Sequence, residues 1–142
     1  MIKICFVCTG NTCRSIMAER IMKNLLKQKK IEQIKVCSKG LRANGENITE
    51  NAKKVLRYNG LSSLNRKSVK LKKIDKNTLY IVMTNQMKSF VDSKKLISFE
   101  DLIGQEVIDP YGQDESVYQK TFVLLEKGIK ILLNKIQMES MQ

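Results

Sequence analysis

Apolar positions along the chain follow two patterns, short continuous runs and longer stretches with helical spacing. Continuous apolar runs over residues 2–7 and 78–83 predict buried strands. Apolar and polar positions alternate over residues 33–38, which predicts a third strand. Residues 96–99 and 106–108 are shorter strand candidates.

Helical spacing fills the segments between these strands. Residues 15–30 and 115–136 each place apolar side chains three and four positions apart, so each predicts a helix with one buried face. Asn47, with Glu50 three residues later, predicts the cap of another helix that ends near Gly60. Residues 85–95 are also expected to be helical.

Strands that alternate with helices are typical of α/β proteins. We therefore expect one domain over residues 1–142, built on a four-stranded parallel sheet with helices on both faces. Ligands of such sheets bind beyond the carboxyl ends of the strands. The turns at residues 8–15 and 109–114 each follow a strand candidate, so we expect both at the same edge.

The net charge of +12 is unevenly distributed, since residues 1–95 contain 22 of the 26 Lys and Arg but only 6 of the 14 Asp and Glu. A basic surface suits nucleic acid, an acidic surface or a phosphorylated partner. Aromatic residues make up only 6% of the chain and no nucleic-acid motif is present, which argues against nucleic acid. A composition rich in Lys, Asn and Ile also arises from genome bias alone.

No apolar run approaches the ~20 residues of a membrane span. We expect a cytoplasmic protein that does not bind membranes, whose four Cys are reduced thiols. The chain contains no His, which excludes catalysis by Ser-His-Asp or Cys-His groups and the zinc sites of HExxH motifs. We expect neither a metal nor a cofactor.

The segment Cys8-Thr9-Gly10-Asn11-Thr12-Cys13-Arg14-Ser15 joins the first strand to the first helix. Backbone N–H groups of a tight loop, together with a helix N-terminus, form a cradle for anions. Gly10 and Asn11 tolerate the positive φ that such a loop needs. Arg14 offers a two-pronged guanidinium to phosphate oxygens, and Cys8 faces a positive field that favours the thiolate. Cys5 and Cys37 are instead expected to be small buried residues.

Several segments resemble the low-molecular-weight protein tyrosine phosphatase family. FVCTGNTCRS followed by MAE is similar to the C-x5-R-S loop of that family, and CSKG at 37–40 resembles its S-A-G. IVMT at 81–84 and DPYG at 109–112 resemble its third strand and its acid loop. The resemblance implies a four-stranded parallel sheet and hydrolysis of a phosphorylated protein side chain through a phosphocysteine intermediate.

The resemblance also implies a role for each matching residue. Cys8 would be the nucleophile, Asp109 the general acid and Ser15 the support of the thiolate. Phosphate would bind to residues 9–14, that is to Thr9, Gly10, Asn11, Thr12, Cys13 and Arg14, and Asn11 would also hold the loop conformation. Tyr111 and Thr12 would form the rim that contacts the substrate. Phosphate, sulfate and vanadate are expected to compete for the loop.

The sequence departs from the family pattern at Ile16, where Pro is usual, at Lys39, where Ala is usual, and at Gln86, near which a His is often found. Thr12 stands where tyrosine phosphatases usually have an aliphatic residue. A Thr there resembles the bacterial protein arginine phosphatases of the same family. Phosphoarginine is therefore slightly favoured as substrate, with phosphotyrosine as the alternative.

Other functions fit the sequence less well. Arsenate reductases resemble this fold but need further redox Cys, and residues 78–104 contain none. A non-catalytic phosphopeptide-binding module would need neither Cys8 nor Asp109. Cys8 and Cys13 lie at the two ends of one loop, so we also expect them to act as a redox pair in which Cys13 traps oxidised Cys8 as a disulfide.

Overall fold

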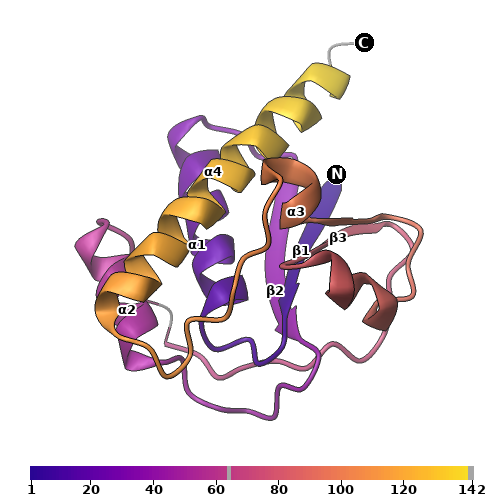
Figure 1. Cartoon of the computed structure of the whole chain (residues 1–142). Coiled ribbons are helices and arrows are strands. Elements are labelled where there is room, and N and C mark those ends of the chain that lie inside the picture. The colour runs from indigo at the N-terminus through magenta and orange to yellow at the C-terminus, as the bar shows by residue number, and fades with distance from the viewer. Residues whose placement is uncertain (64, 141–142) are drawn as a thin grey trace.

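A four-stranded parallel sheet forms the centre of the computed structural model, which describes residues 1–63 and 65–140. The strand order is β2-β1-β3-β4 (Figure 1). The strands are β1 (Ile2–Cys8), β2 (Ile34–Gly40), β3 (Thr78–Val82) and β4 (Leu96–Ser98). All three strand pairs are parallel, which confirms the predicted sheet.

Four α-helices pack around the larger of the two hydrophobic cores. They are α1 (Arg14–Gln28), α2 (Glu50–Tyr58), α3 (Phe99–Ile103) and α4 (Glu115–Ser140). Alternate residues of the sheet, such as Phe6 and Ile81, are buried with Met17 of α1 and Leu125 of α4. The apolar faces that the spacing predicts for the first and last helices are therefore the faces that close this core.

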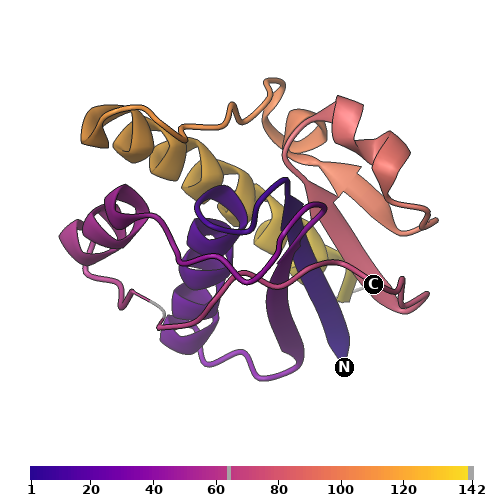
Figure 2. The same ribbon diagram turned by 90° about the horizontal axis from the view of Figure 1, so that it is seen from below.

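The second face of the sheet has a smaller core. Val7 and Val82 pack there with Val91, at the end of the 3₁₀ helix η1 (Asn85–Phe90), and with Leu71 of the extended segment that leads to β3. Figure 2 shows α1 and η1 on opposite sides of the strands. The layer expected on this face is thus made by one short helix and an extended segment.

The N-cap residue of the helix α2 is Thr49, not Asn47 as predicted. The Thr49 side chain accepts a hydrogen bond from the N–H of Ala52, and the Thr49 N–H donates to the carbonyl of Thr12. Asn47 is exposed and accepts a hydrogen bond from Lys67 instead. Thr49 becomes the N-cap because it contacts the loop that follows β1. The local sequence does not predict this contact.

Two other predicted elements are wrong in extent or type. The helix expected over residues 85–95 is only η1, because the chain becomes extended at Val91, which is buried against the sheet. Residues 106–108 form no strand: the Val107 N–H donates to Met83, but no ladder follows. Cys5 is buried as expected, whereas Cys37 is exposed because β2 is an edge strand.

The short helix α3 escaped the sequence analysis although its signal is present. The Ser98 side chain accepts a hydrogen bond from the Asp101 N–H at 3.1 Å, and the Asp101 carboxylate accepts one from the Ser98 N–H at 2.9 Å. This reciprocal pair is a capping box, which the spacing of Ser98 and Asp101 allows to be foreseen.

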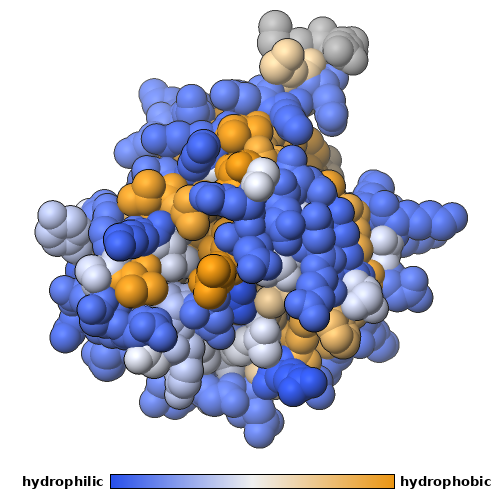
Figure 3. Space-filling view, viewed as in Figure 1, coloured by the Kyte–Doolittle hydropathy of each residue, from blue (hydrophilic) through white to orange (hydrophobic). Residues whose placement is uncertain are grey.

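Hydrophilic side chains cover most of the face that α4 crosses, with exposed apolar side chains in patches between them (Figure 3). Within residues 1–63 and 65–140, no helix has the length and apolar character needed to cross a membrane.

The glycine inside α4 permits close packing of α3. A Cβ atom at Gly128 would lie 2.5 Å from Cδ1 and 2.7 Å from Cε1 of the buried Phe99 ring. We expect Gly128→Ala to lower the free energy of unfolding by about 1–3 kcal/mol, because overpacking outweighs the helix propensity gained. Urea unfolding monitored by circular dichroism measures this, with Lys127→Ala, exposed on the same helix, as control. A Gly128→Ala protein as stable as the wild type would contradict the packing described.

Candidate active site

The last residue of β1, Cys8, forms part of the wall of a cavity of about 510 Å³ at the carboxyl edge of the sheet. Its thiol is 1% exposed. Of the segment predicted to bind phosphate, all residues except Asn11 line this cavity, and they are joined by residues 46–50, Asp109 and Tyr111. The turns after β1 and around Asp109 therefore do meet at one edge, as the parallel topology predicts.

Two donors surround the Cys8 sulfur. The Asn11 N–H donates to Cys8 Sγ at 3.2 Å, and Ser15 Oγ lies 2.9 Å from the same atom. Ser15 Oγ also accepts a hydrogen bond from Asn11 Nδ2 at 2.7 Å, so the hydroxyl proton is free to point at the sulfur. The Asn11 N–H and the Ser15 hydroxyl are therefore both placed to donate to the Cys8 sulfur.

Asn11 holds the loop from behind and does not face the cavity. It is fully buried, and its φ of 56° is the left-handed conformation that the loop requires; Gly10 does not adopt it. Its Nδ2 donates to Ser38 Oγ at 3.0 Å, and its Oδ1 accepts from the Val69 N–H at 2.9 Å. Asn11 thus contributes its backbone to the loop while its side chain ties the loop to β2 and to the segment before β3.

Gly40, at the end of β2, lies directly against the loop. A Cβ atom at this position would come within 2.9 Å of Asn11 Cβ, Asn11 N and the carbonyl carbon of Gly10. Real Cβ atoms essentially never approach backbone so closely. The glycine of the CSKG segment is therefore required by the position of the loop.

A buried carboxylate completes the support of the loop, and the sequence analysis did not identify it. Glu19 of α1, 4% exposed, accepts a hydrogen bond from Ser38 Oγ at 2.6 Å and pairs with Arg66 at 3.1 Å and Lys23 at 2.7 Å. Arg66 also donates to Ser38 Oγ at 2.7 Å. The only signal for Glu19 was its place in the MAE segment, and Arg66 had none because it lies far away in sequence.

Arg14 is 3% exposed and is held at the cavity by the segment that carries Asp109. Its Nη1 donates to the Val107 carbonyl at 2.8 Å, and its Nη2 lies 3.7 Å from Asp109 Oδ2. Its Nε is buried and has no hydrogen-bond partner among the described residues. The first turn of α1 has no side-chain cap, so its N–H groups also remain available to an anion.

Asp109 connects the loop to the mouth of the cavity. Its Oδ1 accepts hydrogen bonds from Cys13 Sγ at 3.5 Å and from the Tyr111 N–H at 3.1 Å, while 46% of its side chain stays exposed. Burial raises the pKa of the Cys13 thiol, and the nearby Cys8 and Asp109 raise it further, so Cys13 is a neutral donor. Tyr111 is 68% exposed at the rim.

Thr12 also faces the opening. A Cβ atom added at Gly10 would lie 3.5 Å from Thr12 Oγ1. The Thr12 carbonyl accepts a hydrogen bond from the Thr49 N–H at 3.0 Å. Two further carboxylates, those of Glu46 and Glu50, line the same cavity. Hydrogen bonds from Ser68 and from the Asn44 N–H hold the pKa of Glu46 below its usual range, so Glu46 is ionised at neutral pH.

A thiol that ends a parallel strand and accepts a hydrogen bond from a loop N–H, in a cavity also lined by an Arg and an Asp, is the arrangement of a cysteine-dependent phosphatase. The family model described as "Low molecular weight phosphotyrosine protein phosphatase" matches residues 3–142. The chain belongs to the low molecular weight protein tyrosine phosphatase family, and it is a protein phosphatase of that family.

Its relatives include enzymes named for two different substrates. The chain is 32% identical to the protein-arginine-phosphatase of Geobacillus stearothermophilus, over 96% of this chain and 97% of the relative. It is 35% identical to the low molecular weight protein-tyrosine-phosphatase PtpA of Staphylococcus epidermidis, over 96% and 94%. A solved structure of the YwlE arginine phosphatase, a cysteine-to-serine mutant with a phosphorylated active-site serine, superimposes with a TM-score of 0.84, 29% identity and 96% coverage of both chains.

The contact between Gly40 and the loop yields a prediction. We expect Gly40→Ala to weaken binding of orthovanadate at least about tenfold, ~1.4 kcal/mol, because the loop must move away from the added methyl group. Isothermal titration calorimetry measures the affinity, and Lys39→Ala, the preceding residue of β2, is the control. Unchanged vanadate affinity in Gly40→Ala would show that this close approach does not set the loop geometry.

Proposed function

We propose that Cys8 is the nucleophile of this phosphatase. Its thiolate attacks phosphorus, a phosphocysteine forms, and the bond from phosphorus to the leaving group breaks. The observation that carries the proposal is the position of the Cys8 sulfur. The sulfur accepts a hydrogen bond from the Asn11 N–H and lies 2.9 Å from Ser15 Oγ. Cys8 also forms part of the wall of the cavity that the loop lines. The phosphorylated serine of the YwlE mutant supports it, since there the residue that replaces a cysteine carries the phosphoryl group.

Asp109 serves as the general acid and then as the general base. In the first step its carboxyl proton goes to the leaving group. In the second step its carboxylate takes a proton from water, water oxygen bonds to phosphorus, and the Cys8 thiolate departs with phosphate as product. Asp109 fits this role because it stands at the mouth of the cavity, is part exposed to water, and lies 3.7 Å from Arg14 Nη2.

Arg14 and the loop stabilise the transferring phosphoryl group. The unpartnered Nε of Arg14 and the N–H groups of the loop and of α1 are fixed before the substrate arrives, so they need no reorganisation in the transition state. Phosphate, sulfate and vanadate bind at the same loop, because each presents tetrahedral or trigonal oxygens to these donors. Phosphorylated proteins are the substrates that the family implies.

Phosphoarginine is the phosphorylated residue that the cavity favours. The guanidinium of this substrate is cationic once it is released, and three acidic residues, Glu46, Glu50 and Asp109, are among those that line the cavity. The Thr12 hydroxyl adds a polar group where an aromatic ring would need an apolar surface. The relative named protein-arginine-phosphatase supports this preference.

Phosphotyrosine is the alternative, and Tyr111 favours it. An exposed aromatic side chain on the rim offers a stacking surface for a phenol ring. The relatives named protein-tyrosine-phosphatase are as similar to this chain as the arginine phosphatases are. An arsenate reductase is not favoured, because residues 78–104 contain no further Cys. A binding module without catalysis is not favoured, because Cys8, Arg14 and Asp109 line one cavity.

Cys8 and Cys13 are proposed to form a reversible disulfide after oxidation by peroxide. The Cys8 thiolate attacks the peroxide O–O bond and becomes a sulfenic acid, and the Cys13 thiol then forms the disulfide with loss of water. Both thiols are buried in the same loop, and the charge of Cys8 influences the pKa of Cys13. The cytoplasmic location, in which the four Cys would be reduced thiols, stays a prediction.

Substitution of the two catalytic groups separates their roles. We expect Cys8→Ser to lower kcat at least about 10³-fold while vanadate still binds, and Asp109→Asn to lower kcat about 10²–10⁴-fold with little change in KM. Steady-state kinetics with para-nitrophenyl phosphate, and calorimetry for vanadate, measure the two effects. Cys37→Ser, an exposed thiol on the edge strand, is the matched control and keeps full activity. Appreciable turnover by Cys8→Ser would exclude Cys8 as nucleophile.

The substrate preference is tested at Thr12. We expect the wild type to hydrolyse phosphoarginine peptides with a higher kcat/KM than phosphotyrosine peptides, and Thr12→Ile to shift this ratio roughly tenfold toward phosphotyrosine, ~1.4 kcal/mol. Thr12→Val, which keeps the shape but not the hydroxyl, separates the two properties. A wild type that prefers phosphotyrosine tenfold would rule out phosphoarginine and leave the phosphatase assignment intact.

A further inference from the structure

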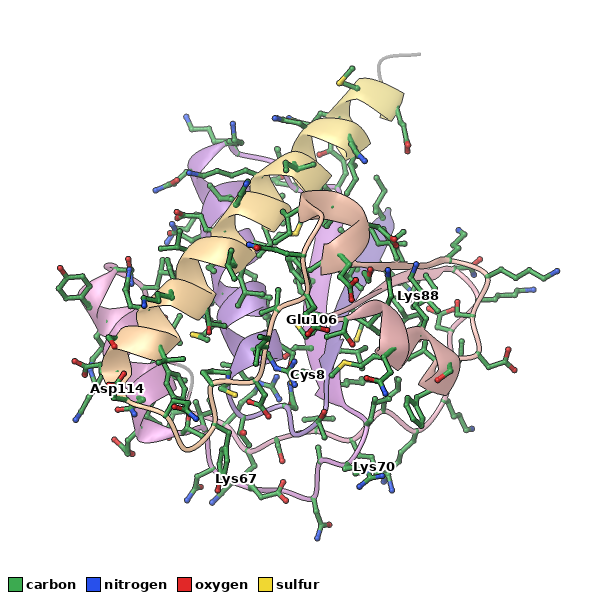
Figure 4. All side chains as sticks on the ribbon, in the orientation of Figure 1. Cys8, Lys67, Lys70, Lys88, Glu106 and Asp114 are labelled. Atoms are coloured by element: carbon green, nitrogen blue, oxygen red, sulfur yellow. The ribbon has the colours of Figure 1, made fainter. Side chains whose placement is uncertain are left out.

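A line of cations leads away from the active-site cavity. A groove of about 570 Å³ shares Thr9 with that cavity, and Arg42 and Lys72 form part of its wall. A hollow of about 670 Å³ shares Lys72 with the groove. We call the cations of these two concavities the basic track, which consists of Lys39, Arg42, Lys70, Lys72 and Lys73. In Figure 4, Lys70 lies below Cys8, toward the lower margin of the view.

The backbone that carries the basic track is fixed to the catalytic loop. The Arg42 N–H donates to the Thr9 carbonyl at 2.8 Å, and the Val69 N–H donates to Asn11 Oδ1 at 2.9 Å. The backbone at Arg42 and at Val69 is therefore held against the catalytic loop. A ligand that reaches from the cavity into the track meets a surface that is already in place.

The charges of the basic track are not neutralised within the protein. Arg42, Lys70, Lys72 and Lys73 are exposed, and none of the five cations forms an ion pair with a carboxylate of the described residues. Residues 66–76 contain six Lys or Arg and a single acid, against 26 Lys and Arg in the whole chain of 142. A general bias toward Lys does not produce this concentration beside the active site.

The groove between the cavity and the hollow also has apolar walls. Leu41, Leu71, Ile74, Met87 and Phe90 line it, and the Phe90 side chain is 66% exposed. One acid, Asp92, stands among these residues. The groove thus suits a polypeptide with both apolar and acidic side chains better than a uniformly charged ligand.

We propose that the basic track docks an acidic segment of the substrate protein that neighbours the phosphorylated residue in sequence. This proposal rests on the proposed function, since it requires a phosphorylated side chain in the cavity. The substrate backbone leaves the cavity over Thr9, crosses the apolar groove, and brings its carboxylates to Lys70, Lys72 and Lys73. The cavity and the track then select different parts of the substrate: the cavity binds the phosphorylated side chain, and the track binds the acidic residues that neighbour it in sequence.

Exposed charge pairs accelerate association more than they strengthen the final complex, and salt screens them. The selection should therefore appear in kcat/KM at low ionic strength and decline as salt is added. A small substrate that never reaches the track gains nothing from it.

The test compares two peptides that carry the same phosphorylated residue, flanked by four Glu in one and four Gln in the other. The track variant is Lys70→Gln/Lys72→Gln. The control variant, Lys127→Gln/Lys135→Gln, removes the same charge from exposed positions of α4 that form no ion pair among the described residues. We expect wild type and control to prefer the Glu peptide about tenfold in kcat/KM, and the track variant to lose most of this preference. Turnover of para-nitrophenyl phosphate stays equal in all three proteins.

The proposal would be overturned if the track variant preferred the Glu peptide as strongly as the wild type does, or if the wild type showed no preference between the two peptides. A DNA oligonucleotide that inhibits peptide turnover at lower concentration than an unphosphorylated Glu peptide of equal charge would overturn it too, and would assign the track to nucleic acid. If no protein turns over any substrate, the proposed function fails instead. Fluorescence anisotropy of the labelled peptides then tests docking without turnover. Tighter binding of the Glu peptide that is lost in the track variant would support docking, and equal binding of the two peptides would reject it.

Discussion

The structure depends on one buried amide, the side chain of Asn11. A loop that points its N–H groups at a single centre has an unfavourable backbone conformation, and here Asn11 adopts the left-handed φ of 56°. Its side chain compensates with hydrogen bonds to Ser15, Ser38 and the Val69 backbone. Each partner belongs to a different element, so the loop is held by α1, β2 and the segment before β3 together. Gly40 lies directly against Asn11, and the Glu19–Arg66 pair holds Ser38, to which Asn11 is bound, so both features support the same loop.

The parallel sheet brings the reacting groups together from distant segments. Cys8 ends the central strand β1, and the segment of Asp109 reaches it because Val107 donates to Met83 just after β3 and accepts from Arg14. The same edge presents the segment of residues 66–73, whose backbone is bound to the loop. Catalysis and recognition of the surrounding sequence can therefore be coupled without a second domain.

The periodicity of the sequence predicted the parts of the fold that local physics determines. The strands over β1 and β3 and the buried faces of α1 and α4 follow from apolar spacing alone. The cap of α2 could not be predicted, because Thr49 is selected by its contact with Thr12. The exposure of Cys37 depends on the strand order, which spacing does not encode.

The residues of the candidate site likewise fall into those that the sequence predicted and those that it did not. Cys8, Arg14 and Ser15 lie within one short segment, so their chemistry was visible in the sequence; Glu19 and Arg66, 47 positions apart, meet only in the folded chain. The central proposal is that Cys8 carries the phosphoryl group during turnover. Rapid acid quench of the wild-type reaction, followed by mass spectrometry of the proteolysed protein, measures this directly. We predict one phosphoryl group on the Cys8 peptide within the first turnover. Active enzyme with the phosphoryl group on another residue, or with no covalent phosphoryl group, would contradict the assignment of Cys8 as nucleophile.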